Sequence, residues 1–323
     1  MKIKSEMFEG SAKAHNQHKL ILTIILFYVV FAIIALAEGI IPYIITADDV
    51  KQATSELDLV NFDMETIQKY IEISTEITTT TKVMIVSLFC TVFGTLISMF
   101  YCRCGEMRSL RSMGVTKKKC VPSYLIGLGV GALLMTLLVL VNVACGSYSI
   151  SLCRNINFPI ILLFAMGWFV QGMSEEFIFR GYLMNTIGGK YSPAVAVGIS
   201  AAAFSLAHIQ NPGFNAYVFL NLALFGVFAG LYMLLTDNIW GASAIHSIWN
   251  CLQGNFYGIS VSGTGNYDSV FKTAQASKNK LLTGGEFGIE GSVFTTIILV
   301  AASVIVFMMI KKKNSAETAA AEA

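Results

Sequence analysis

Eight apolar stretches alternate with polar segments along this chain of 323 residues. They run approximately over residues 20–46, 83–102, 121–145, 158–188, 193–210, 214–235, 239–257 and 292–310. A helix needs about 20 apolar residues to cross the hydrocarbon core of a bilayer, and the fifth and seventh stretches are marginal by this measure. The pattern predicts an all-α fold, a polytopic membrane bundle of about eight transmembrane helices.

The composition agrees with a chain that lies in a lipid bilayer. Hydrophobic residues make up 55% of the sequence and charged residues only 13%, which is more apolar than an ordinary soluble domain. The basic runs border apolar stretches, so membrane topology explains them and they predict no nucleic-acid partner.

Charge is distributed unevenly between the segments that join the apolar stretches. Lysine and arginine cluster at residues 2–19, 103–119 and 311–313, whereas acidic residues cluster at 48–76. With eight crossings, the three basic regions fall on one side of the membrane and the acidic segment on the other. Cytoplasmic loops carry an excess of lysine and arginine, so we expect both termini in the cytoplasm. The lysine- and isoleucine-rich sequence, without eukaryotic signals, indicates a bacterial plasma membrane.

Three charged residues lie together in the fourth apolar stretch: Glu175, Glu176 and Arg180. Each charge at bilayer depth costs roughly 2.5–3.5 kcal/mol on insertion scales, so such groups pair, line a cavity or do chemistry. Glu176 and Arg180 are four residues apart on one helix face and predict an ion pair. Glu175 is rotated by about 100° from Glu176 and is left as a free carboxylate that suits a general base. Alternatively, all three groups pair and hold two helices together.

Two further polar pairs follow in the next helices. Phe204 and His208 form F-x-x-x-H, and His246 and Asn250 form H-x-x-x-N. The second spacing puts imidazole and carboxamide on one helix face, where they can polarise a carbonyl or hold an oxyanion. Each pair also fits a structural alternative, a hydrogen-bonded histidine or an interhelical polar contact of about 0.6–2 kcal/mol.

The depths of these groups predict an intramembrane polar cavity. Counted from the turn at 189–192, Glu175 and His208 lie at similar helical distances, roughly 22–26 Å. His246 lies nearer the cytoplasmic side, so a tilt or a bent helix has to bring it to the other two.

The three motifs, in this order and in a polytopic chain, resemble those of the CPBP family of intramembrane proteases. This family includes type II CAAX prenyl endopeptidases and bacteriocin-processing or immunity proteins, and the resemblance covers about residues 155–255. It implies a helical bundle with a water-filled cavity, in which Glu175 and His208 activate water and His246 and Asn250 stabilise the oxyanion. Glu176, Arg180 and Phe204 then support these four residues.

The resemblance divides the chain into three parts. Residues 1–154 hold the N-terminal transmembrane helices and a long outer loop, and residues 155–257 form the CPBP-like catalytic core. Residues 258–323 hold a second outer loop, the last transmembrane helix and a cytoplasmic tail. The outer segment 255–291 is rich in glycine and serine, which is typical of a flexible connection.

The cofactor stays open at this point, because the family has been described both as metalloproteases and as metal-independent glutamate proteases. If zinc is bound, Glu175, His208 and His246 are its candidate ligands. The H-E-x-x-H pair of many zinc proteases is absent from the sequence.

The expected function is an intramembrane endopeptidase that cleaves a peptide or membrane-protein substrate with water activated by a glutamate and a histidine. A first alternative is a non-catalytic bacteriocin-immunity or receptor protein with the same fold. A second is a proton-coupled transporter, which predicts inverted repeats that the sequence does not show.

Overall fold

The computed structural model describes residues 5–57 and 63–322, and this part of the chain is mostly helical. Helices account for 74% of the structure, so the expected helical class is confirmed apart from one small sheet. Strands β1 (Tyr148–Leu152) and β2 (Phe271–Gln275) pair antiparallel, with Tyr148 opposite Gln275.

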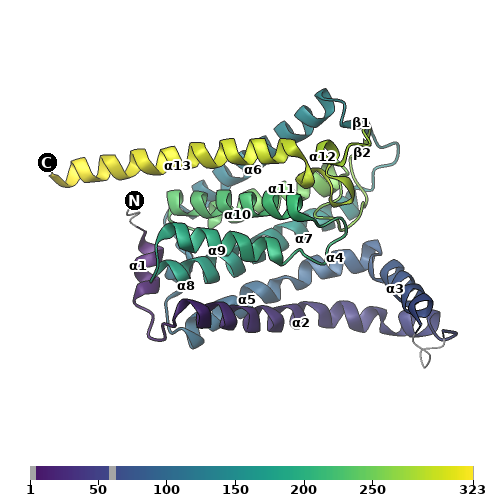
Figure 1. Cartoon of the computed structure of the whole chain (residues 1–323), viewed down its shortest axis with the longest axis horizontal. Coiled ribbons are helices and arrows are strands. Elements are labelled where there is room, and N and C mark those ends of the chain that lie inside the picture. Colours follow the sequence, from purple (N-terminus) through teal and green to yellow (C-terminus); the bar gives the residue numbers. More distant parts are fainter. Residues whose placement is uncertain (1–4, 58–62, 323) are drawn as a thin grey trace.

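Most of the helices run along one common direction (Figure 1). The helices of the bundle are α2 (Leu20–Ala53), α4 (Thr81–Cys90), α5 (Val92–Phe100), α6 (Cys120–Ala144), α7 (Phe158–Glu176), α9 (Pro193–Leu206), α10 (Ala216–Thr236), α11 (Trp240–Cys251) and α13 (Val293–Glu322). The other α-helices are α1 (Glu6–Ala12), α3 (Met64–Thr78), α8 (Asn185–Gly188) and α12 (Lys280–Thr283). Three π-helical segments extend α5, α7 and α11: η1 (Tyr101–Gly105), η3 (Phe177–Met184) and η4 (Leu252–Phe256).

Six helical segments of the described chain are long and apolar enough to cross a membrane. They are Leu20–Ala53, Thr81–Gly105, Cys120–Ala144, Phe158–Gly188, Ala216–Thr236 and Val293–Glu317. The eight full spans expected from the sequence are therefore not confirmed. The two that fall short are α9 and α11, the marginal stretches. With 14 residues, α9 rises only about 21 Å, less than the ~30 Å of a hydrocarbon core.

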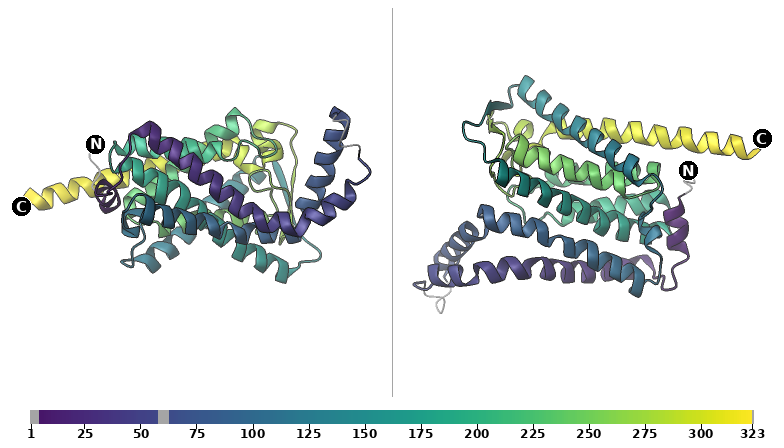
Figure 2. Two further views of the ribbon diagram at one scale, coloured as in Figure 1. Left: turned by 90° about the horizontal axis from the view of Figure 1, so that it is seen from below. Right: turned by 180° about the vertical axis from the view of Figure 1, so that it is seen from behind.

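The helices stack in layers that place α11 in the interior (Figures 1 and 2). On one side lie α2, α4 and α5, of which α4 and α5 contact α7, and on the other side lie α6 and α13. Between them, α11 packs against α6 and α7, while α10 packs against α9 and α13. Glycines allow the close approach: a Cβ at Gly127 of α6 would lie 2.4 Å from the carbonyl oxygen of Gly241. One at Gly172 of α7 would lie 2.6 Å from the amide nitrogen of Ser247.

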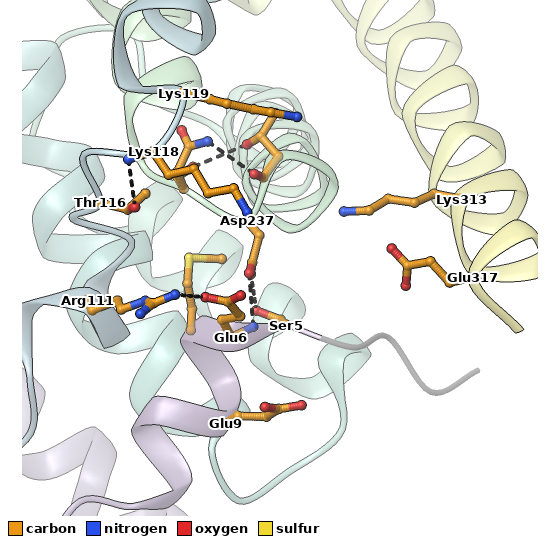
Figure 3. A pocket seen from close by; sticks show the side chains of 13 residues that line it. Ser5, Glu6, Glu9, Arg111, Thr116, Lys118, Lys119, Asp237, Lys313 and Glu317 are labelled. Atoms are coloured by element: carbon orange, nitrogen blue, oxygen red, sulfur yellow. Dashed lines mark hydrogen bonds and ion pairs between the residues drawn. The ribbon is translucent and has the colours of Figure 1, made fainter. Parts of the chain in front are cut away.

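The two ends of the bundle differ in character. At one end, here called the terminal end, α1 packs against α8, and the last turns of α13 project beyond the bundle (Figure 1). A hollow of about 510 Å³ at this end is lined by Arg111, Lys118, Lys119 and Lys313, together with acidic side chains (Figure 3). The opposite end, here called the loop end, carries α3, α12 and the β1–β2 sheet (Figure 1).

Candidate active site

A pocket of about 200 Å³ in the bundle is lined by all four residues predicted to do the chemistry, Glu175, His208, His246 and Asn250. They come from three different elements: the last turn of α7, the turn that follows α9, and α11. Phe204 lines the same pocket. The structure therefore brings together the groups of all three sequence motifs.

The predicted ion pair between Glu176 and Arg180 is present and completely buried. The Arg180 Nη1 atom lies 2.9 Å from the Glu176 Oε1 atom, and both side chains are 0% exposed. Directly after Glu176 the α-helix widens into the π-helical segment η3, which contains Arg180. Such π-turns are frequent at functional sites.

The aromatic ring of Phe204 contacts the charged groups of the cluster. The Arg180 guanidinium lies 4.5 Å from the centre of the Phe204 ring, a cation–π contact. The same ring packs against the imidazoles of His208 and His246, at centroid distances of 5.0 Å and 5.7 Å. The predicted supporting position of Phe204 has this physical basis.

His246 contacts both glutamates of the first motif. Its Nδ1 atom lies 2.9 Å from Glu176 Oε1, and its Nε2 atom lies 3.5 Å from Glu175 Oε2. Sequence reasoning assigned Glu176 to Arg180 alone and missed the second partner. The Glu176 carboxylate accepts from Nδ1–H and so fixes the orientation of the imidazole ring.

The depth difference expected for His246 does not arise in the structure. The connection before α11 is buried, since Asn238 is 3% and Ile239 is 0% exposed. The Ile239 amide donates to the carbonyl of Gly114 at 3.1 Å. Because α11 starts inside the bundle rather than at its surface, counting residues from the preceding turn underestimates the depth of His246.

Gln171 joins two of the predicted residues, and the sequence analysis did not single it out. Its Nε2 atom donates to Glu175 Oε1 at 2.6 Å, and its Oε1 atom accepts from Asn250 Nδ2 at 2.9 Å. Gln171 lies four residues before Glu175 on α7, on the same helix face. This spacing is the sequence signal that could have identified it.

His208 faces the pocket from the side opposite to α7. Its Nδ1 atom lies 2.9 Å from the carbonyl oxygen of Phe204. A carbonyl only accepts hydrogen bonds, so Nδ1 carries a proton in this contact and the proton on Nδ1 leaves Nε2 as the ring nitrogen that can accept. Among the described residues, no hydrogen bond joins His208 to Glu175, so any cooperation between them needs a bridging molecule.

Several polar atoms of the charged cluster are left without hydrogen bonds from the described residues. These buried atoms are Glu175 Oε2, Glu176 Oε2, Arg180 Nε and Arg180 Nη2. Buried polar groups are nearly always paired in proteins. Other buried atoms of the described chain also lack partners, but these four belong to charged groups in contact with one another.

A further carboxylate, Glu290, lines the pocket from the loop end. Its Oε2 atom accepts from the Ser262 amide at 2.6 Å, the Ser262 hydroxyl at 3.1 Å and Gln253 Nε2 at 3.1 Å. Burial raises the pKa of the Glu290 carboxyl, against the opposing effects of these hydrogen bonds and of nearby His208. The sequence carried no signal for it, because Glu290 lies within the segment 255–291, which was interpreted as a flexible loop.

Residues 157–252 match the model of a protein family described as type II CAAX prenyl endopeptidase Rce1-like. The resemblance to the CPBP family is thereby confirmed over this segment. It is a family of proteases, and together with the apolar helices the match identifies an integral membrane protein. No curated protein and no solved structure matches the chain significantly.

The matched segment, residues 157–252, contains all seven residues predicted from the motifs and also Gln171. Glu290, Ser262 and Gln253 lie beyond its C-terminal boundary. The side of the pocket that Ser262 and Glu290 line therefore belongs to a part of the chain to which the family match does not extend.

The zinc ligands suggested by the sequence do not form a metal site in this arrangement. Within residues 5–57 and 63–322, no group of three or more His, Cys, Asp or Glu side chains is placed to hold a metal ion. Of the suggested set, Glu175 and His246 approach each other, while His208 directs Nδ1 to a carbonyl. We derive no reaction step through a metal ion.

Proposed function

We propose that the protein is an intramembrane endopeptidase that hydrolyses a peptide bond with water activated by Glu175 and His208. The observation that carries the proposal is the convergence of an acid/base carboxylate, two imidazoles and a carboxamide on one pocket. The match to a protease family supports the same reaction class. The substrate is a peptide or a membrane-protein segment held at this pocket.

Glu175 acts as the general base in this mechanism. One of its oxygens is held by Gln171, while Oε2 has no hydrogen-bond partner among the described residues and is free to accept a proton. Glu175 takes a proton from the water molecule, and His208 Nε2 orients the water by accepting its second O–H. The water oxygen then bonds to the scissile carbonyl carbon.

His246 and Asn250 stabilise the negative oxygen of the tetrahedral intermediate. With a proton on Nε2, His246 is a donor, and the formal charges of His246, Arg180, Glu175 and Glu176 sum to zero. A neutral group of charges is the least costly one to bury. Asn250 gives one amide hydrogen to Gln171 and keeps the other for the oxyanion. One such donor is worth about 10²–10³ in rate.

Collapse of the intermediate completes the reaction. Glu175 returns its proton to the nitrogen of the leaving amine, the C–N bond breaks, and the products are a new carboxyl terminus and a new amino terminus. Glu175 is then ionised again and ready for the next turnover, so no further reactant is consumed.

Topology follows from the charged ends of the bundle. Both termini lie at the terminal end (Figure 1), where Lys118, Lys119 and Lys313 gather (Figure 3). The positive-inside rule supports a cytoplasmic position for this end in a bacterial plasma membrane.

The test compares native membranes that contain the wild type, Glu175→Gln or Glu72→Gln, with all new peptide termini identified by mass spectrometry. Glu72 is exposed on α3, so its variant is a control for a lost surface carboxylate. We expect new termini with wild type and Glu72→Gln, and none with Glu175→Gln. Identical termini from wild type and folded Glu175→Gln would contradict a peptidase and leave a binding function.

A further inference from the structure

The pocket that holds Glu175 and His208 extends toward the loop end of the bundle. Its outer lining consists of Asn211, Ser262, Thr264 and Glu290, which belong to connections at that end. The described lining includes no residue of α1, of α8 or of the segment 106–119, the elements of the terminal end. The pocket therefore joins the catalytic groups to the loops that carry Ser262 and Glu290.

The distribution of lysine and arginine between the two ends indicates which side of the membrane the pocket faces. Basic residues from two of the basic runs, 103–119 and 311–313, line the hollow at the terminal end alongside acidic residues, among them Arg111, Lys119 and Lys313 (Figure 3). An excess of lysine and arginine marks cytoplasmic loops. The loop end, and with it the mouth of the pocket, then faces the non-cytoplasmic side.

The charged groups in the pocket are complementary to a cation. Glu175 and Glu290 both line it, and no lysine or arginine does so within the described chain. The proton proposed for His246, which lines the same pocket, offsets Glu175 but leaves Glu290 without a counter-charge. Acidic residues on α3, such as Glu72 and Glu76, add negative charge at the same end of the molecule. An uncompensated charge in a cleft attracts ligands of the opposite sign.

Glu290 is the group in the pocket that the proposed reaction leaves without a role. It is 8% exposed, and all hydrogen bonds that described residues donate to its carboxylate go to Oε2, which leaves Oε1 unused. No described lysine or arginine forms an ion pair with it. A buried carboxylate without a cationic partner is costly, and a positively charged ligand removes that cost.

We infer that the pocket receives a peptide segment from the non-cytoplasmic side of the membrane and that Glu290 binds a lysine or arginine side chain of that segment. The substrates are then cationic secreted peptides or outer segments of membrane proteins. This inference rests on the proposed peptidase activity and adds to it a direction of entry and a preferred residue.

The direction of entry is tested by labelling cysteines in intact cells with a membrane-impermeant maleimide. Native Cys104 is exposed near the terminal end and native Cys145 is exposed at the loop end. Two variants keep one of these thiols each, and a third carries Thr264→Cys at the pocket rim in place of both. Cys120, Cys153 and Cys251 are replaced by alanine throughout, and the two buried cysteines stay.

We expect Cys145 and Thr264→Cys to react in intact cells, and Cys104 to react only after the cells are permeabilised. The reverse pattern overturns the inference, whatever the peptidase assay shows. The expected labelling pattern combined with no peptidase activity leaves the orientation standing and removes the proposed reaction, so the two failures are distinguishable.

The preferred residue is tested with matched peptides that carry either lysine or the neutral, similarly shaped norleucine, based on the cleavage sites found by terminus analysis. We expect wild type to favour lysine. Glu290→Gln should lower kcat/KM for the lysine peptide about ten- to hundredfold, the range for a lost charged hydrogen bond, and leave the norleucine peptide nearly unchanged.

An equal loss for both peptides would show that Glu290 acts only through the Ser262 loop or through His208, and no loss would show that it does not contact the substrate. Either result overturns the assignment. Binding of the lysine peptide to Glu175→Gln, and to the same protein with Glu290→Gln added, measures the contact without cleavage.

Discussion

The protein contains two buried clusters of charged side chains, and they differ in how many of their polar atoms have hydrogen-bond partners. Near the terminal end, Arg108 donates to Glu106 at 2.5 Å, to Ser112 at 2.7 Å and to Thr186 at 3.1 Å. The Thr186 hydroxyl in turn donates to Glu106 at 3.0 Å. Among the described residues, no buried side-chain atom of Glu106 or Arg108 lacks a hydrogen bond.

The cluster at the pocket is built from the same residue types but is incomplete. Arg180 uses Nη1 for its hydrogen bond to Glu176, and its other two guanidinium nitrogens have no partner in the described chain. The glutamates likewise keep an unused oxygen each. A completely bonded ion pair stabilises one arrangement, whereas the unused Oε2 of Glu175 lies in a residue that lines the pocket. Buried charge alone therefore does not distinguish the two clusters, and their hydrogen bonding does.

The largest effects are expected for two matched substitutions, one in each cluster, which should change stability in one case and cleavage in the other. Glu106→Gln leaves the Arg108 charge buried without a counter-charge, which costs about 3–5 kcal/mol of unfolding free energy. Cleavage per folded molecule should stay at the wild-type level. Glu175→Gln should have the opposite profile, with stability retained and cleavage reduced by about 10²–10⁴, the usual contribution of a general base.

Both quantities are measured on the purified protein in detergent, by thermal unfolding and by the rate of peptide cleavage. A Glu106→Gln protein with wild-type stability and reduced cleavage would break the comparison, because the terminal cluster would then take part in the reaction.

An intermediate effect is expected for Glu176→Gln, since Glu176 both forms a buried ion pair and orients a residue of the proposed reaction. It pairs with Arg180 and also accepts from His246. Gln keeps the shape but loses the charge, so we expect kcat to fall about ten- to hundredfold, equal to one charged hydrogen bond. A pH–rate profile gives the specific evidence, because the limb that reports on His246 should move.

An unchanged profile with a lower unfolding temperature would reduce Glu176 to a structural partner of Arg180. Arg180→Lys is the companion variant, since it retains the positive charge while removing the planar guanidinium group.

The smallest effect is expected for Gln171→Leu, which removes the bridge between Glu175 and Asn250. One neutral hydrogen bond contributes about 0.5–1.5 kcal/mol, so we expect kcat to fall about two- to tenfold with little change in KM. Gln68→Leu on the exposed face of α3 is the matched control. A change in KM alone would place Gln171 in substrate binding rather than in the positioning of Glu175.

Helical spacing explains why so much of the candidate site could be predicted. Glu176 and Arg180 had to meet because residues four apart share a helix face, and the structure has them 2.9 Å apart. The same spacing relates Gln171 to Glu175, so this contact was also within reach of the sequence. The predicted number of spans is not confirmed where it relied on hydropathy in short helices, since α9 and α11 are too short to count as full spans.

Contacts between distant segments were beyond sequence reasoning for a physical reason. Arg108 was grouped with the basic loop 103–119, yet it is 3% exposed, because Tyr182 and Thr186 from another helix supply its acceptors. Glu290 approaches the pocket only because its segment folds back over the loop end.

By itself, the sequence determined the membrane setting, the mostly helical class and the residues of the three motifs. These properties follow from local hydropathy and from the fixed rise and turn of a helix. Only the tertiary structure decided that His246 faces both glutamates, that Gln171 links Glu175 to Asn250 and that Glu290 closes the pocket. Which helix faces meet, and how deep each helix starts, depends on packing between segments that are far apart in the chain.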